Sequence, residues 1–215
     1  MSHLTVIGGT GYAGSAIVAE AAARGHAVTA LSRSLPADRV PDVNYVQGDA
    51  TDEAALSSVV SGADVVVGAL APRGTLAGTF RDVYRTIARL AAAEGVPLFV
   101  VGGFSSLRPA AGAPRFVEDL SHAPAGYHDE IVSVAALVVD DLPATPEALN
   151  WVFVSPAAKF GSFAPGERLG VYRVGDDVAV QAEGGGAISG ADYALGLVDL
   201  IEKGNHHRTH VNLAY

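Results

Sequence analysis

The sequence predicts an α/β fold, in which a doubly wound parallel sheet carries one small additional lobe. Short apolar runs alternate with helical stretches along most of the chain, and a glycine-rich turn follows the first apolar run. Two longer stretches break this alternation. The 215 residues are 49% hydrophobic and 17% charged, so the chain has enough apolar side chains to build a core.

The apolar runs are short and are bounded by glycine, proline or turn residues, which is typical of buried strands. We expect strands over residues 4–7, 27–31, 43–46, 64–67, 98–101, 151–154 and 209–213. Because helical stretches separate these runs, right-handed crossovers should join the strands into a parallel sheet with helices on both faces.

The helical stretches are predicted over residues 11–24, 51–60, 76–94, 127–141 and 190–203. In the third of these, apolar side chains recur on one face from Phe80 to Ala91, and Gly95 ends the pattern. Thr51 is expected to cap the second helix, and Ser189 with Asp192 forms a capping box for the last one.

Two stretches depart from the alternation. Residues 102–125 form a long connection rich in glycine, proline and serine, and such loops are usually functional or mobile. Residues 156–188 include a predicted hairpin with strands at 171–174 and 178–181. We therefore expect one domain over residues 1–215, in which residues 156–189 contribute a small lobe above the carboxyl ends of the strands, where ligands bind in such sheets.

The charge and composition exclude several classes of protein. The formal net charge is −9, and no basic run is present, which argues against a nucleic-acid partner. The absence of cysteine excludes disulfides, thiolate metal sites and cysteine nucleophiles. No basic leader precedes the first apolar run, and the apolar runs are too short to cross a bilayer, so we expect a cytoplasmic protein with no membrane partner.

The most specific motif is the glycine spacing Gly8-x-x-Gly11-x-x-Gly14, which follows the first predicted strand and opens the first predicted helix. In this context Gly8 permits a tight turn, Gly11 lets the backbone approach a pyrophosphate, and Gly14 lets the helix pack closely on the sheet. The helix N-terminus then offers free N–H groups to phosphates. The motif predicts a Rossmann-like dinucleotide site.

The residues after the second strand indicate which dinucleotide is preferred. A carboxylate there would bind the ribose 2′-hydroxyl of NAD, but this chain has Ser32, Arg33 and Ser34. Arg33 can bind a 2′-phosphate, so NADP(H) is favoured over NAD(H), the alternative being a solvated loop arginine. Asp49 could accept a hydrogen bond from adenine or could serve only as a carboxylate at the entry of the next helix.

Four further segments sharpen the identification: residues 101–107 (VGGFSSL), 151–158 (WVFVSPAA), 165–168 (PGER) and 188–194 (ISxxDYA). With the glycine motif, they resemble the atypical short-chain dehydrogenases/reductases, and among them the NAD(P)H-flavin reductases, relatives of the biliverdin reductase B-like and NmrA-like proteins. The resemblance covers essentially the whole chain. It implies a seven-stranded doubly wound fold that binds NADP(H) and reduces a flavin, such as FMN, or a similar flat acceptor.

The resemblance also implies cofactor contacts along the chain. The pyrophosphate would be held by Gly8, Gly9, Thr10, Gly11, Tyr12 and Ala13. The 2′-phosphate would be bound by Arg33 beside Ser32, the adenine edged by Asp49 and Ala50, and the ribose lined by Ala69 and Leu70. The nicotinamide would be bordered by Gly102, Gly103, Ser105, Ser155, Pro156 and Ala157.

Most members of the superfamily reduce carbonyls with a Tyr-x-x-x-Lys pair, which this sequence does not contain. Its two lysines are Lys159 and Lys203, and the residues four positions before them are Ser155 and Asp199. A flavin or quinone takes a hydride directly and spreads the charge over its rings, so its reduction mainly requires that two flat rings be held together. The sequence therefore favours such an acceptor over a carbonyl compound.

Other side chains are weaker candidates for chemistry. Ser105 and Ser106 could hydrogen-bond a substrate or could simply form a loop turn, and His128 could donate a proton or could be a solvated residue at a helix start. Lys159 could face a flavin phosphate. The three histidines at 206, 207 and 210 lack a clear carboxylate partner, so we expect no metal site.

The sequence thus predicts an NADPH-dependent reductase of a small-molecule flavin or quinone acceptor, as a monomer or homodimer. One alternative is a non-catalytic NADP(H)-binding redox sensor of the NmrA-like kind, which would bind the cofactor without consuming it. Another is a carbonyl or enone reductase that uses Ser105 or His128.

Overall fold

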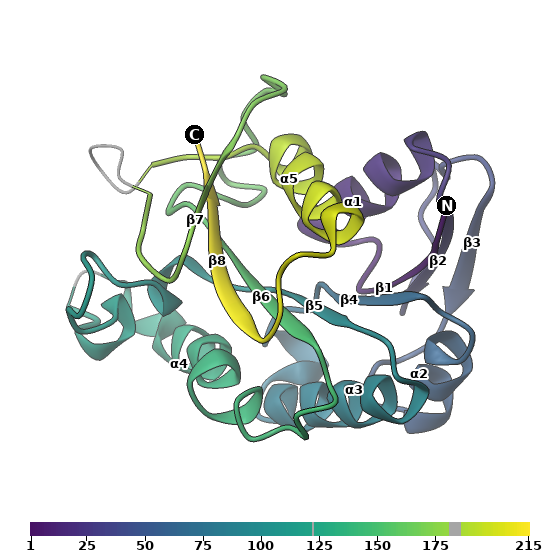
Figure 1. The fold of residues 1–215 in the computed structure, drawn as a ribbon, viewed down its shortest axis with the longest axis horizontal. Coiled ribbons are helices and arrows are strands. Elements are labelled where there is room, and N and C mark those ends of the chain that lie inside the picture. The colour runs from purple at the N-terminus through teal and green to yellow at the C-terminus, as the bar shows by residue number, and fades with distance from the viewer. Residues whose placement is uncertain (122, 181–185) are drawn as a thin grey trace.

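The structure is a computed structural model, and it describes residues 1–121, 123–180 and 186–215. Over these residues eight strands form one sheet in the order β3-β2-β1-β4-β5-β6-β8-β7 (Figure 1). The strands are β1 His3–Ile7, β2 Ala27–Ser32, β3 Val43–Gln47, β4 Val65–Gly68, β5 Leu98–Val101, β6 Trp151–Pro156, β7 Arg173–Gly175 and β8 Thr209–Ala214. All pairings are parallel except that of β7 with β8. The predicted α/β class and doubly wound sheet are confirmed.

Helices cover both faces of this sheet. The α-helices of the described chain are α1 Tyr12–Ala23, α2 Glu53–Val60, α3 Phe80–Glu94, α4 His128–Ala136 and α5 Gly190–Lys203. Single 3₁₀ turns lie at Gly74–Leu76, Phe104–Ser106, Phe116–Glu118 and Ala125–Tyr127, and a π-helical turn at Leu137–Asp141. Figure 1 shows α1 and α5 on one face, with α2, α3 and α4 on the other. None of the helices in the described residues has the length and apolar character needed to cross a membrane.

Successive residues of the central strands serve the two faces in turn. Leu4 and Val6 of β1 pack in the apolar core that contains Ile17 of α1 and Leu197 of α5. Thr5, between them, is fully buried on the other side and donates its hydroxyl hydrogen bond to the carbonyl oxygen of Val59 in α2, 2.6 Å away. A strand buried on both faces needs apolar residues at nearly every position, which explains why these runs stand out in the sequence.

Two predicted helices differ from the observed ones. The helix expected from residue 76 begins at Phe80, because Gly78 has a φ of +80° and interrupts the helical backbone after the turn Gly74–Leu76. The helix expected over 127–141 is α-helical only to Ala136 and then widens into the π-helical turn Leu137–Asp141, where the N–H of Leu142 donates to the carbonyl oxygen of Leu137.

Thr51 does not cap α2, contrary to the prediction. Its N–H and its hydroxyl both donate to the same Oδ1 of Asp49, each at 2.9 Å. Asp52 is the cap instead, and its carboxylate accepts from the N–H of Ala54 at 2.9 Å. Asp49 therefore forms its own turn before the helix and shifts the cap by one residue.

The predicted hairpin of strands 171–174 and 178–181 is also wrong where it can be judged. β7 pairs antiparallel with β8, Val174 lying opposite Leu213. The N–H of Val180 donates to the side chain of Asn212 at 2.7 Å, and Gln181 lies outside the described residues. An isolated two-stranded hairpin is only marginally stable, whereas the open edge of β8 belongs to a large sheet and has free backbone groups. β7 therefore pairs with β8 and becomes an eighth strand beyond the seven parallel ones.

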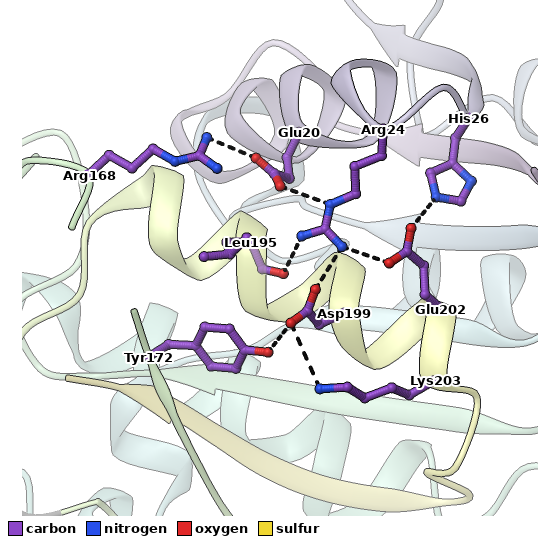
Figure 2. A network of polar contacts seen from close by, with 9 residues as sticks. All are labelled: Glu20, Arg24, His26, Arg168, Tyr172, Leu195, Asp199, Glu202 and Lys203. Carbon is purple, nitrogen blue, oxygen red and sulfur yellow. Dashed lines mark hydrogen bonds and ion pairs between the residues drawn. The ribbon is translucent and has the colours of Figure 1, made fainter. Parts of the chain in front are cut away.

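Charged side chains join α1 to α5, the pair of helices on one face of the sheet (Figure 2). The guanidinium of Arg24 contacts Glu20 of its own helix at 2.9 Å, and Asp199 and Glu202 of α5 at 2.7 Å each. Glu20 is buried, so its charge depends on this contact and on a second one with Arg168 at 2.9 Å. The network fixes the rotation of α1, whose N-terminal end carries the glycine motif.

Hydrogen bonds within this network lower the pKa values of its carboxylates. Burial opposes ionisation of Asp199, but the hydrogen bonds from Tyr172 and Arg24 outweigh burial and lower its pKa. The pKa of Glu202 is lowered chiefly by its hydrogen bond with His26 and also by Arg24. The stabilisation that these carboxylates provide is complete above their unfolded pKa values and is lost as the pH falls through the folded ones.

We expect Arg24→Ala to lower the free energy of unfolding by about 1–2 kcal/mol at pH 7, because Glu20 loses a buried partner. The loss should shrink at pH 3, where the partner carboxylates are largely protonated in the unfolded chain. Urea unfolding at both pH values measures this. Arg89→Ala is the matched control, because Arg89 pairs with Glu53 at 2.7 Å on an exposed surface and should change stability by at most about 0.5 kcal/mol. An equal loss for both variants contradicts the prediction.

Candidate functional site

A cavity of about 640 Å³ opens at the carboxyl ends of the central strands. It lies where the strand order reverses, because β1 is followed outward by β2 on one side and β4 by β5 on the other. Loops that leave β1 and β4 diverge at such a point and leave a crevice, which is where ligands bind in doubly wound sheets. The lining extends from the loop after β1 to the segment after β6 and the first turns of α4.

The glycine-rich turn at one side of this cavity leaves no room for a side chain at three of its positions. At Gly9, a Cβ would lie 2.7 Å from the Cβ of Ala30. Gly8 has a φ of +90°, and a Cβ there would lie 2.5 Å from the carbonyl oxygen of Ala69. A Cβ at Gly14 would lie 2.1 Å from the carbonyl oxygen of Gly8. By contrast, a Cβ at Gly11 would meet no atom closer than 3.4 Å. Gly8, Gly9 and Gly14 are therefore required by the fold, whereas Gly11 borders open space in the cavity.

The N-terminus of α1 faces this space with its first amides uncapped by a side chain, since its cap residue is Gly11. Thr10, Tyr12 and Ala13 line the cavity beside it, whereas Gly9 packs against Ala30 and does not line it. A helix start with free N–H groups and no side chain in front is suited to an anion such as a pyrophosphate. The glycine-rich turn and the N-terminus of α1, which together form the phosphate cradle, thus fit the pyrophosphate of a dinucleotide.

Arg33 and Ser32 lie at the outer end of the cavity, at the carboxyl end of β2. The guanidinium of Arg33 donates to the hydroxyl of Thr75 at 2.9 Å, and the Ser32 hydroxyl donates to the carbonyl oxygen of Ser34. The hydrogen-bond partner of Arg33 is a neutral hydroxyl, and the positive charge of Arg33 acts on the nearby Asp49 carboxylate and can also attract a phosphate.

Asp49 and Ala50 line the same end of the cavity. The pKa of Asp49 is lowered by the hydrogen bonds from the backbone N–H and the hydroxyl of Thr51, so this carboxylate is ionised at neutral pH. One Asp49 oxygen accepts both bonds. The two interpretations of Asp49 left open by the sequence are therefore compatible: it forms the turn before α2 and also borders the cavity.

The middle of the cavity is bordered by Ala69 and Leu70 after β4 and by Gly102 and Gly103 after β5. A Cβ at Gly102 would lie 2.2 Å from the ring of Phe153, so only glycine allows β5 and β6 to pack here. These residues bring the two strand ends close to the glycine-rich turn without filling the space between them.

The three predicted catalytic side chains lie in different surroundings. Ser105 and Ser106 line the cavity, and Ser106 is almost fully buried. His128 is not among the described residues that line it, and its Nε2 contacts the carbonyl oxygen of Ala123 at 2.9 Å. Glu130, two residues further along α4, lines the cavity instead. The catalytic roles of all three side chains remain predictions.

Ser155, Pro156 and Ala157 are buried at the end of β6 and do not line the cavity as the structure describes it. The Ser155 hydroxyl donates to the carbonyl oxygen of Gly103 at 2.9 Å and contacts Nε2 of His210 at 2.8 Å. Ser155 therefore supports the cavity wall from its buried side, by holding the backbone of Gly103.

His210 continues this buried chain. Its Nδ1 lies 3.3 Å from the guanidinium of Arg115, which can only donate, so Nε2 carries the proton and donates to Ser155. Arg115 also donates to the carbonyl oxygen of Ser106 at 2.5 Å and pairs with Asp177 at 2.9 Å. Burial, with the nearby positive charge of Arg115, lowers the pKa of His210 to about 3. The neutral imidazole thus helps to hold residues 103–106 at the cavity.

The remaining sequence candidates lie away from the cavity. The Lys159 side chain is exposed, and its backbone pairs with residues 186–188. Among the described residues no group of histidines and carboxylates is placed to hold a metal ion, since His210 points into the interior while His207 is exposed.

Phe160, Phe163, Arg73 and Glu130 are among the lining residues that the sequence analysis missed. Arg73 and Glu130 form an ion pair at 2.6 Å between the loop after β4 and α4. The two phenylalanines belong to the predicted lobe, and aromatic residues beside glycine and serine in a loop are a signal that could have marked them.

The chain is similar to a family of proteins described as NAD(P)H-binding, whose model matches residues 8–203. It is 33% identical over 203 residues to YwnB, an uncharacterized protein of Bacillus subtilis (strain 168), and the match covers 94% of this chain and 92% of YwnB.

Two solved structures are similar over nearly their full lengths. A "putative epimerase" from Bacteroides thetaiotaomicron is 30% identical with a TM-score of 0.87, covering 100% of this chain and 97% of the other. A "putative NADH-flavin reductase" from Streptococcus pneumoniae TIGR4 is 30% identical with a TM-score of 0.82, covering 100% and 99%.

We expect Gly11→Ala and Gly14→Ala to separate binding from folding. The Gly11→Ala methyl group enters the cavity, so the Kd for NAD(P)H should rise at least about tenfold while stability changes by at most about 0.5 kcal/mol. The Gly14→Ala methyl group overlaps the Gly8 backbone and should lower stability by about 1–3 kcal/mol. Cofactor titration and urea unfolding measure the two effects, and equal behaviour of the two variants would refute the assignment.

His210 should contribute to acid sensitivity. The histidine of the unfolded chain binds a proton near pH 6.5, whereas the folded one stays neutral down to about pH 3. The free energy of unfolding therefore decreases as the pH is lowered between these values. In His210→Asn the slope of unfolding free energy against pH should be smaller by up to about 1.4 kcal/mol per pH unit. Urea unfolding between pH 6.5 and 5 measures it, with His207→Asn as the exposed control. An unchanged slope in His210→Asn would show that the buried imidazole does not act in this way.

Proposed function

The chain belongs to the NAD(P)H-binding family, and we propose that it uses NADPH to reduce a flavin or a quinone-like flat acceptor. The observation that carries this proposal is one continuous cavity. It joins the glycine-rich turn and the N-terminus of α1 at one side to apolar and aromatic side chains, among them Phe104, Ile131 and Phe163, at the other.

The cofactor would be held from the phosphates outward. The uncapped amides at the start of α1 would bind the pyrophosphate above Gly11, and Arg33 would bind the 2′-phosphate from the end of β2. Since β2 ends in Ser32 and Arg33 rather than in a carboxylate, the strand end itself offers a positive charge to the additional phosphate of NADPH, and this charge faces the ionised Asp49 at the same end of the cavity. The nicotinamide would then reach Gly102 and Gly103 at the end of β5.

The chemistry at the other side of the cavity supports an acceptor that needs no strong acid. Among the described lining residues there is one tyrosine, Tyr12, and no lysine. The hydroxyl of Tyr12 donates to the carbonyl oxygen of Pro165 at 2.9 Å and accepts from the N–H of Gly190 at 2.8 Å, so it is engaged with the backbone. A carbonyl substrate would require a proton donor of the Tyr-Lys type, whereas a flavin or quinone would not.

The bound nicotinamide supplies a hydride, and the chain's own residues set the conditions for its transfer. Val101, Ile131 and Val134 give the lining apolar surface that excludes water from two facing rings. Ser105, at the same wall, is placed to hydrogen-bond the acceptor or the nicotinamide amide. The similarity to the "putative NADH-flavin reductase" supports a flavin acceptor, while Arg33 supports NADPH as the cofactor.

The test is NADPH oxidation by the purified protein, followed at the nicotinamide absorbance with and without FMN, and with NADH as the comparison. We expect FMN-dependent oxidation that favours NADPH. In Arg33→Ala the KM for NADPH should rise about tenfold or more, because a charge-assisted contact is lost, while the KM for NADH changes little. Arg39→Ala is the matched control, since Arg39 is exposed in the same loop and does not line the cavity as described.

Two outcomes would contradict this proposal. Tight NADPH binding without consumption by any flavin or quinone would indicate the non-catalytic sensor of the NmrA-like kind. An equal rise of the KM values for NADPH and NADH in Arg33→Ala would contradict the assignment of Arg33 to the 2′-phosphate and would leave the proposed reductase activity in place.

A further inference from the structure

Phe163 is an exposed aromatic side chain at the cavity. Its exposed fraction is 78%, and apart from Met1 it is the most exposed large apolar side chain in the described part of the chain. It lines the cavity from the segment that follows β6. A single exposed apolar side chain is common on a protein surface, but this ring also lines the cavity, where a bound flat molecule would cover it and gain the free energy of burying it.

The turn that carries this ring is closely constrained. Gly161 has a φ of +146°, and a Cβ there would lie 2.7 Å from Cε1 of the Phe163 ring, so the ring rests against the backbone of Gly161. The N–H of Ala164 donates to the carbonyl oxygen of Gly161 at 2.9 Å. On the other side, the N–H of Lys159 donates to the carbonyl oxygen of Gly186 at 3.1 Å. The ring is therefore presented by a short turn that is bonded before and after it.

Tyr12 fastens the same turn to the glycine-rich loop. Its ring meets Phe160 edge to face, with centroids 5.2 Å apart and planes at 75°. Its hydroxyl contacts the backbones of Pro165 and Gly190 on either side of the lobe. Since Tyr12 is also the first residue of α1, the position of the Phe163 turn is set relative to the cofactor cradle.

The wall formed by the loop after β5 carries a second aromatic group. Phe104 lines the cavity and is stacked on Phe116, with ring centroids 4.7 Å apart and planes at 25°. β5 and β6 are neighbours in the sheet, so their following loops leave it at the same edge. Aromatic rings thus border the acceptor side of the cavity from two successive loops.

We infer that Phe163 is the specificity-determining residue for the acceptor, a platform on which a flat, multi-ring π system stacks while it faces the nicotinamide. This inference rests on the proposed function and deepens it. It predicts that the protein discriminates acceptors by ring area, because a tricyclic flavin covers more of the exposed Phe163 ring than a monocyclic quinone does. Gly161 and Tyr12 are then positioning residues, which act by holding the Phe163 turn.

The first experiment measures binding without turnover. FMN is titrated into protein saturated with NADP⁺, which occupies the cofactor site and has no hydride to transfer, and quenching of flavin fluorescence reports stacking. We expect the Kd for FMN to rise about tenfold in Phe163→Ala and in Phe163→Leu, which keeps apolar bulk but removes the ring. Phe163→Trp should bind FMN as well as the unmodified chain does.

Two further variants test the geometry. Leu169→Ala is the matched control, because Leu169 is exposed in the same lobe and does not line the cavity as described, so its Kd for FMN should be unchanged. Gly161→Ala retains the phenylalanine but displaces its ring, and it should weaken FMN binding to a similar extent as Phe163→Ala.

The second experiment separates acceptor recognition from cofactor binding. In Phe163→Ala the KM for FMN should rise about tenfold, the KM for p-benzoquinone should change less, and the KM for NADPH should stay constant. Equal FMN affinity in the unmodified chain, Phe163→Ala and Phe163→Leu would overturn this inference and leave the reductase intact. Absence of any flavin or quinone reduction by the unmodified chain would instead overturn the proposed function.

Discussion

The contact between Gly14 and the carbonyl oxygen of Gly8 is the constraint on which the rest of the site depends. A side chain at Gly14 would overlap that oxygen at 2.1 Å, so α1 can approach the sheet this closely only with glycine there. The close approach places the first amides of α1 at the mouth of the cavity and leaves them free of side-chain caps. A helix shifted outward would keep its dipole but would no longer direct its free N–H groups at a phosphate.

Charged and aromatic contacts, in addition to the glycine turn, fix the rotation of α1 about its own axis. Arg24 ties its C-terminal half to α5, and Tyr12 at its other end bonds to Pro165 in the segment after β6. The same helix therefore positions the phosphate cradle and supports the turn that carries Phe163. This arrangement fixes the position of the Phe163 turn relative to the N-terminus of α1.

The opposite wall is supported by buried polar groups that are distant in sequence. Ser155 on β6 donates to the carbonyl oxygen of Gly103 and is itself bonded by His210 on β8, and Arg115 donates to the carbonyl oxygen of Ser106. A buried polar chain of this kind is stable only when its members satisfy one another, and here the neutral imidazole is bonded at both nitrogens. The loop after β5 is thereby fixed where residues 102–106 border the cavity.

The sequence by itself determined the features that depend on local spacing: the parallel strands, the glycine turn between β1 and α1, and the Ser189 cap of α5 with its partner Asp192. It also predicted the family of NAD(P)H-binding proteins, which is confirmed.

Only the tertiary structure decided which of several possible hydrogen-bond and strand-pairing partners a residue takes. Asp49 takes the Thr51 donors and moves the cap to Asp52, and the free edge of β8 draws β7 away from a hairpin. Ser155 points to His210 rather than to the cavity, and Phe163 is brought to the cavity by a segment bonded to Tyr12 and to residues 186–188. These outcomes depend on residues far apart in the chain, whose encounter no local pattern encodes.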